Sequence, residues 1–117
     1  MNKGFIDTSF GSIYYEQYGE INSNPTIVLL HDAIGSVSIM GSFPKLIYEA
    51  TQMSVLVFDR IGYGKSDDDV RARTTDYLQF EAEERLPEIL LKLGVSNPIL
   101  IGHSDGGTIA LAFAASH

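Results

Sequence analysis

The sequence contains no cysteine, which excludes disulfide bonds, thiolate catalysis and cysteine-based metal sites. Basic residues are scarce: 8 Lys and Arg stand against 15 Asp and Glu, which gives a net charge of −7. Because an acidic surface repels phosphate groups, we expect neither nucleic acid nor an anionic membrane as a partner. No apolar run reaches the roughly 18 residues of a membrane span, and the N-terminal residues lack the apolar core of a signal peptide. These absences predict a cytoplasmic protein.

Sequence patterns for cofactors and metals are also missing. Gly64-Lys65-Ser66 imitates the end of a phosphate-binding P-loop, but Asp59 occupies the position of the required first glycine. The run Asp67-Asp68-Asp69 is more typical of a solvated loop than of a metal site, because three consecutive residues of an extended chain cannot converge on one ion. We therefore expect no cofactor and no metal.

The first part of the chain predicts an antiparallel hairpin. At 117 residues the chain holds one domain at most. Phe5–Ser9 and Ser12–Tyr18 read as two strands joined at Phe10-Gly11. Side chains of the second strand alternate between two faces, which indicates a hairpin with one face toward solvent.

From Thr26 onward, buried strands alternate with helices. The predicted strands are Thr26–Leu30, Ser54–Phe58 and Pro98–Ile101. The predicted helices run from Ser42 as cap to Ala50, from Asp76 to Gly94, and over Thr108–Ala115. Asp76 and Gln79 form a possible capping box of the second helix, and Pro87 predicts a kink within it. This order is typical of an α/β fold, a three-layer sandwich whose mostly parallel sheet carries the N-terminal antiparallel hairpin.

The most informative motif is Gly102-His103-Ser104-Asp105-Gly106, which lies between the third buried strand and the last helix. A G-x-S-x-G sequence in this position is a nucleophile elbow, in which a sharp, strained turn presents the serine. The alternative is a serine that only caps the helix. Motif and context together favour Ser104 as a nucleophile.

Two further motifs follow the first two buried strands: Leu29-Leu30-His31, and Asp59-Arg60-Ile61-Gly62-Tyr63-Gly64-Lys65-Ser66 after Phe58. In this order and spacing the chain resembles the α/β-hydrolase fold family, with small esterases, enol-lactonases, C–C bond hydrolases and haloperoxidase-like members most similar. The resemblance covers the whole chain but only the first half of that fold. It implies a serine-dependent hydrolase that acts on an ester, thioester or activated carbonyl of a small molecule.

An oxyanion hole needs two backbone N–H groups aimed at the developing negative charge. One is the amide of Asp105, after the nucleophile at a helix N-terminus; the resemblance places the other at Ala33. Asp32 departs from the commonest pattern, which has glycine there. We favour a loop-ordering role for this carboxylate over contact with substrate, and keep Asp32, Ile34 and His103 as candidate pocket residues.

The remaining candidates have structural interpretations. The resemblance implies that His31 props the oxyanion loop and that the side chain of His103 packs behind the serine. Asp59 and Arg60 are read as an ion pair that shapes the loop below the site. His117 lies 13 residues after Ser104, so roughly 20 Å away along a helix, beyond the reach of a general base.

The family's chain order is serine, acid, histidine, so the resemblance places both triad partners and the lid after residue 117. Residues 1–117 are then the N-terminal half of one domain, a truncated α/β-hydrolase fold that is inactive alone. Its last strand has a bare edge, which predicts self-association or complementation by the missing half. The alternative is a catalytically dead, hydrolase-like module that binds or dimerises through that edge.

Overall fold

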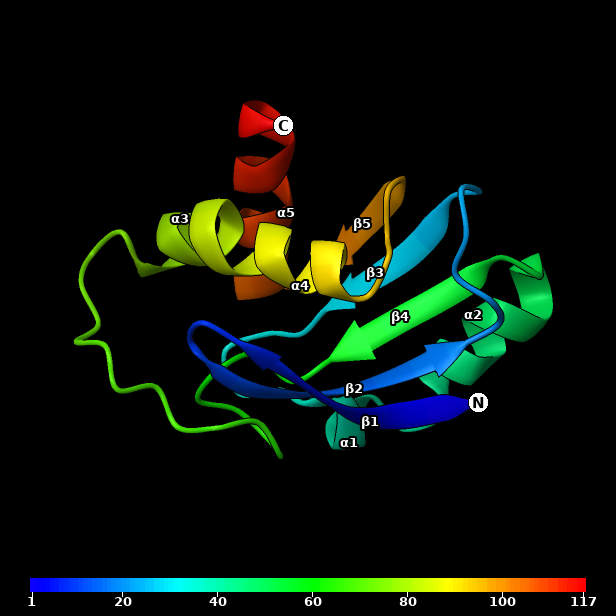
Figure 1. Ribbon diagram of the computed structural model, residues 1–117, viewed down its shortest axis with the longest axis horizontal. Helices are drawn as coiled ribbons and strands as arrows, with labels where there is room; N and C mark the ends of the chain where they lie inside the picture. Colours follow the sequence, from blue (N-terminus) through cyan, green and yellow to red (C-terminus); the bar gives the residue numbers. More distant parts are fainter.

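A five-stranded sheet with helices on both faces forms the structure, a computed structural model that describes residues 1–117 (Figure 1). The strands are β1 (Asn2–Thr8), β2 (Gly11–Tyr18), β3 (Thr26–Leu30), β4 (Ser54–Phe58) and β5 (Pro98–Gly102). Their order in the sheet is β1-β2-β4-β3-β5. β4, β3 and β5 are parallel, whereas β2 runs antiparallel to both β1 and β4. The predicted α/β class and N-terminal hairpin are confirmed.

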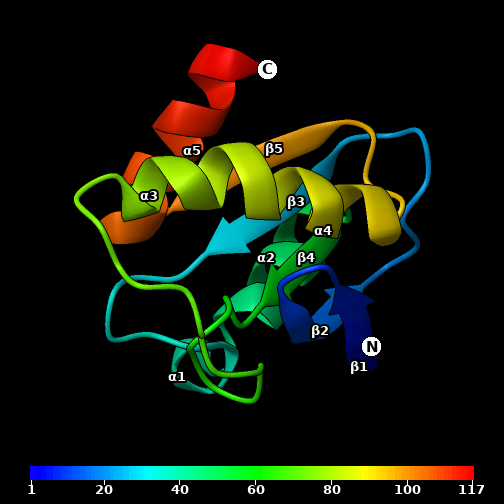
Figure 2. The ribbon, with the colours of Figure 1, turned by 60° about the vertical axis from the view of Figure 1, so that its left-hand side comes forward.

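Helices cover the two faces of the sheet separately (Figure 2). One face packs against α1 (Val37–Met40) and α2 (Phe43–Thr51), and the other against α3 (Tyr77–Phe80), α4 (Leu86–Lys92) and α5 (Asp105–Ser116). Alternate residues of each central strand enter different cores: Val28 and Leu30 one, Ile27 and Leu29 the other. The three predicted layers follow from this alternation, because a strand apolar on both faces needs cover on both.

The hairpin is more enclosed than its sequence pattern predicts. Ile13 is fully buried in one core, and Tyr14, which points the other way, is 4% exposed in the opposite core. The prediction of a solvent-facing side is therefore wrong for β2. The reason is its position between β1 and β4, which brings both of its faces beneath helices.

The helix predicted from Asp76 is interrupted. α3 continues into a π-helical segment, Glu81–Arg85, and α4 begins immediately before Pro87. The Leu86 N–H bonds to the Glu81 carbonyl, five residues back, so the distortion expected from the proline precedes it. The capping box is not formed: the Asp76 carboxylate accepts from the Thr74 hydroxyl, and the Gln79 amide donates to Glu83 at 2.9 Å.

Helix α2 begins after Ser42, as predicted, but the Ser42 side chain makes no capping hydrogen bond. The short helix α1 that precedes it is not predicted by the sequence pattern. Ser36 caps that helix, because its hydroxyl accepts a hydrogen bond from the Ile39 N–H at 3.2 Å.

Strand β5 forms the last edge of the sheet. It pairs with β3 from Thr26 opposite Pro98 to Leu30 opposite Gly102, and its other edge has no strand partner, as predicted. Ile99 and Ile101 are 42% and 44% exposed on it. No helix of the chain combines the length and the apolar character needed to cross a bilayer.

Candidate active site

Ser104 occupies a sharp turn between β5 and α5. Its backbone has φ 55° and ψ −115°, a conformation that glycine adopts freely and L side chains rarely adopt. The strained strand-to-helix turn predicted from the motif is therefore present. The serine is exposed, and its hydroxyl makes no hydrogen bond to another residue.

Two glycines allow this turn to lie close to its surroundings. A Cβ at Gly102 would lie 2.1 Å from the Gly106 carbonyl oxygen, and one at Gly106 would lie 2.1 Å from the Leu30 carbonyl oxygen. Because real Cβ atoms do not approach so closely, both positions require glycine in this geometry. The elbow therefore fits against the end of β3 only with these residues at these positions.

The loop after β3 lies next to the elbow. The His103 N–H bonds to the Leu30 carbonyl at 3.2 Å, which joins the carboxyl ends of β3 and β5. Ala33 is exposed in the loop that follows, and Asp105 is the first residue of α5. Ligands of open α/β sheets bind at this edge of the strands.

Asp32 orders this loop. Its Oδ1 accepts from the Ile34 N–H at 3.2 Å, and its Oδ2 lies 3.2 Å from His103 Nδ1. The His103 side chain is 79% exposed, so the expectation that it packs behind the serine is wrong; it leans toward the carboxylate instead. Asp32 and His103 line a cavity of about 470 Å³, whereas Ile34 is 85% exposed and outside it.

His31 is fixed as a neutral ring. Its Nε2 accepts from the Arg60 N–H at 3.1 Å, so the proton lies on Nδ1, which donates to the Asp32 carbonyl at 2.7 Å. Burial is the largest cause that lowers its pKa. These bonds connect the loop after β3 to the loop after β4, which is the propping role implied for this histidine.

Asp59 and Arg60 do not pair with each other, contrary to the expectation of an ion pair. The Asp59 carboxylate accepts from the Val37 N–H at 2.7 Å and from the Lys65 N–H at 2.9 Å, and Arg60 donates to the Asp32 carbonyl at 3.0 Å. Asp59 shapes the loop by satisfying backbone amides. Backbone donors are sufficient here because both oxygens of the buried carboxylate then have partners.

Tyr77 is a neighbour of the elbow that its sequence context did not indicate. Its hydroxyl donates to the Asp105 carboxylate at 3.0 Å, and this bond is the largest cause that raises the Tyr77 pKa. Read in sequence, the residue belongs only to the apolar stripe of a helix. Only the packing of α3 against α5 brings the two side chains together.

None of the histidines is hydrogen-bonded to the serine. His31 is engaged by two backbone groups, and His103 lies against Asp32. The ring of His117, at the far end of α5, stacks on Phe113 with centroids 4.3 Å apart. The chain thus contains an elbow with its neighbouring loop, but no histidine in contact with Ser104.

Comparison with known proteins agrees with this geometry. The proline iminopeptidase of Saccharolobus solfataricus is 35% identical over 111 residues, 91% of this chain and 34% of that protein. A carboxylesterase structure from Nitrososphaera gargenis has 26% identity and a TM-score of 0.78, covering 97% of this chain and 41% of that one. The structure of the N-acyl homoserine lactonase AidH also has 26% sequence identity and a TM-score of 0.78, and the match covers 99% of this chain and 41% of that one.

The chain spans about a third of the length of the curated relatives it matches. A sequence profile described as alpha/beta hydrolase fold matches residues 25–117, which include the parallel strands β3, β4 and β5 and the elbow. On this match, and on the elbow placed between β5 and α5, the chain belongs to the α/β-hydrolase fold family.

Proposed function

We propose that Ser104 is the nucleophile of a serine hydrolase that acts on an ester, thioester or activated carbonyl of a small molecule. The observation that carries the proposal is the backbone of Ser104, at φ 55° and ψ −115° in the turn between β5 and α5. Such strain persists only where the surrounding structure enforces it, and it is common at functional sites. Here it keeps the hydroxyl exposed at the carboxyl edge of the sheet.

In the proposed reaction, the Ser104 hydroxyl oxygen attacks the substrate carbonyl and passes its proton to a base. The N–H groups of Ala33 and Asp105 hold the oxyanion of the tetrahedral intermediate. This intermediate collapses to an acyl-enzyme on Ser104, and the leaving group takes up the proton. Water then attacks the acyl-enzyme, which releases the acid and restores the serine.

The acid and the histidine of the triad come, in this proposal, from a longer protein of which residues 1–117 are the N-terminal part. Support comes from the chain's share of its relatives, 34% for the iminopeptidase, and from the engagement of its own histidines elsewhere. The chain alone is then inactive, because an unassisted serine hydroxyl is a weak nucleophile. The bare edge of β5 is where the other half, or a second copy, would pair.

The relatives support a small-molecule carbonyl substrate. They include proteins named as an iminopeptidase, carboxylesterases and a lactonase, whose names span peptide, ester and lactone bonds. Compounds with any of these bonds carry an acyl group, which is what the formation of an acyl-enzyme on Ser104 requires. The cavity of about 470 Å³ that Asp32 and His103 line is the candidate pocket for the acyl or leaving group.

Intact mass spectrometry with a fluorophosphonate probe tests the proposal directly. We expect the chain to stay unlabelled in buffer, and to gain one probe adduct at Ser104 when imidazole is added as an external base. Imidazole replaces the proton acceptor, while the elbow and the two amides stay in place. Ser104→Ala is the matched control and should gain no adduct under either condition.

A chain that remains unlabelled at high imidazole concentration would contradict the proposal. That result would favour the second candidate function, a catalytically dead module that binds or dimerises through β5. The exposed Ile99 and Ile101 on the open edge are the observation in its favour. Ile101→Lys should abolish the association of such a module in sedimentation, while Ser104→Ala should leave it unchanged.

A further inference from the structure

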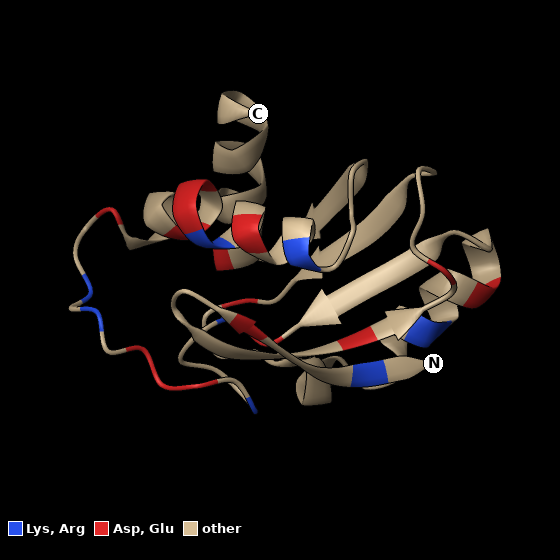
Figure 3. Cartoon of the chain, in the orientation of Figure 1, with Lys and Arg blue, Asp and Glu red and all other residues tan.

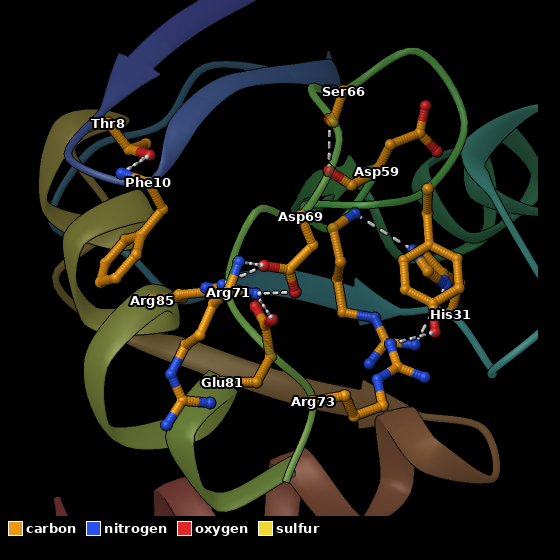
Figure 4. Close-up of polar contacts among 12 residues, drawn as sticks. Thr8, Phe10, His31, Asp59, Ser66, Asp69, Arg71, Arg73, Glu81 and Arg85 are labelled. Atoms are coloured by element: carbon orange, nitrogen blue, oxygen red, sulfur yellow. Dashed lines mark hydrogen bonds and ion pairs between the residues drawn. The ribbon is translucent and has the colours of Figure 1, made fainter. Parts of the chain in front are cut away.

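All four arginines of this acidic chain surround one small cavity beside the elbow. The arginines Arg60, Arg71, Arg73 and Arg85 line it together with Asp69 and Glu81. Figure 3 shows the loop before α3, where acidic and basic residues alternate, and Figure 4 shows Asp69 and Glu81 close to Arg85, with Arg73 on the side toward His31. In a protein of net charge −7, this concentration of cations needs a local explanation.

The two acidic side chains of the cavity, Asp69 and Glu81, both accept hydrogen bonds from Arg85. Its Nη1 and Nη2 donate to Asp69 at 3.0 and 2.9 Å, and Nη1 also contacts Glu81 at 3.3 Å. No carboxylate lies within 4.0 Å of the guanidinium nitrogens of Arg60, Arg71 or Arg73. Three of the four cations therefore lack a counter-ion.

Aromatic rings hold these three guanidinium groups in place. Arg60 lies over the Tyr63 ring at 4.7 Å, Arg71 over Phe80 at 3.6 Å and Arg73 over Tyr77 at 4.3 Å. Stacking on a ring face leaves the N–H edge of a guanidinium free to donate. The cluster is thus orientated, with donors still available.

Several donors and acceptors inside the cavity wall are buried without a partner. Arg60 is 2% exposed and Arg85 5%, and the Nε–H of each makes no hydrogen bond. Glu81 is 6% exposed, and its Oε2 is likewise unpartnered. A buried charge without a counter-ion is costly, so the surroundings of Arg60 favour an anion as its partner.

Glu81 does not prevent an anion from binding here. Burial is the largest cause that raises its pKa, which favours the neutral carboxyl group. A neutral carboxyl has an O–H that donates a hydrogen bond to an anion.

The size and the position of the cavity restrict the ligand. Its volume of about 10 Å³ accommodates roughly one oxygen atom, so only the tip of a larger group enters. Arg73, at the exposed rim, also donates to the Tyr63 hydroxyl at 3.4 Å. Tyr77, which lies beneath Arg73 and lines the cavity, is hydrogen-bonded to Asp105 next to Ser104, so one wall residue of the cavity contacts the elbow.

We propose that this arginine cavity binds a carboxylate group of the substrate, with one oxygen held by Arg60 inside and the other by Arg73 at the rim. The inference rests on the proposed function, because it assigns a substrate class, acyl compounds that carry a carboxylate, to the Ser104 site. Binding itself needs no catalysis, and it is tested separately from labelling of the serine.

The test uses the arginine Nε–H signals in a nitrogen-15 correlation spectrum of the whole chain, which contains only four arginines. Monomethyl succinate, which has one ester and one carboxylate, should shift the Arg60 and Arg73 signals saturably, together with the Asp105 amide. Dimethyl succinate, which lacks the charge, should shift none of them. Sodium chloride at equal ionic strength should also leave them in place.

Arg73→Gln should weaken the binding of monomethyl succinate about tenfold, the effect of losing one hydrogen bond to a charged group. The matched control is Lys45→Gln, which removes the same charge from exposed α2 and should leave binding unchanged. Equal shifts with both esters, with chloride, or in Arg73→Gln would overturn the proposal, as would no shift at all. Ser104→Ala should bind normally, so failure of labelling and failure of this site are separate results.

Discussion

Replacement of Ser104 by glycine should stabilise the protein. The residue has φ 55° and ψ −115°, where a non-glycine residue costs about 1–3 kcal/mol of strain. Glycine removes this strain but loses about 0.5–1 kcal/mol through the greater freedom of the unfolded chain. The Ser104 hydroxyl is exposed and unbonded, so its loss costs little. We expect Ser104→Gly to raise the free energy of unfolding by about 1 kcal/mol in urea titrations, or the melting temperature by roughly 4 °C.

Ser104→Ala separates strain from the loss of the hydroxyl. It removes the same oxygen but keeps a Cβ, so its stability should stay within about 0.5 kcal/mol of the parent chain. The difference between the glycine and alanine variants then measures the strain of the elbow. Equal stability of the two variants would refute the argument, because it would mean that the turn relaxes around a Cβ at no cost.

Three further measurements test other parts of the structure. Gly106→Ala places a methyl group 2.1 Å from the Leu30 carbonyl oxygen and should lower the free energy of unfolding by at least about 3 kcal/mol. Gly107→Ala, whose methyl group would lie 3.4 Å from its nearest neighbour, should raise it by up to about 1 kcal/mol, and similar urea midpoints for the two variants would contradict this. The bond to Arg85 lowers the Asp69 pKa, so the stability contributed by this ion pair is present above pH 3.8 and is lost as the pH falls further. Asp69→Asn should lower the free energy of unfolding by about 2 kcal/mol at pH 7, and the difference between the variant and the parent chain should vanish in acid. Burial, with the Glu16 hydrogen bond, raises the Tyr14 pKa to about 12, so its stabilisation is complete below pH 10 and is lost toward pH 12. Ultraviolet titration should show a phenol that ionises near pH 12, and this signal should be absent in Tyr14→Phe.

The sheet and the elbow could be predicted from sequence because both depend on local patterns. Apolar runs such as Thr26–Leu30 and Ser54–Phe58 are buried on both faces, and this fixes their place at the centre of the sheet. The glycines around Ser104 mark a turn that only small residues permit. In these segments, local preference and tertiary structure agree.

The errors occurred where a side chain had a choice of partners. The sequence predicts that Asp59 pairs with its neighbour Arg60, but Asp59 accepts hydrogen bonds from the amides of Val37, at the start of α1, and Lys65. Asp76 and Gln79 match a capping pattern, yet their side chains form hydrogen bonds with nearby side chains instead of with the backbone at the start of the helix. The run Asp67-Asp68-Asp69 lies in a loop with its first two residues exposed, as predicted, but Asp69 is bonded to Arg85, 16 residues away. Such contacts depend on how loops fold over helices, which spacing along the chain does not record.

The loops beside the Ser104 turn are held by contacts of Asp59 and His31 within this chain. Asp59 holds the start of α1 and the turn at Lys65, and His31 joins the loops after β3 and β4 through two backbone bonds. Gly106 then seats the elbow against Leu30, at the end of the strand from which one of these loops leaves. Positioning is therefore built from residues on both sides of the serine within this chain, whereas proton transfer, in the proposed function, depends on groups of a longer protein. External imidazole replaces only proton transfer, so its effect on labelling distinguishes a positioned but unactivated serine from one that is not positioned at all.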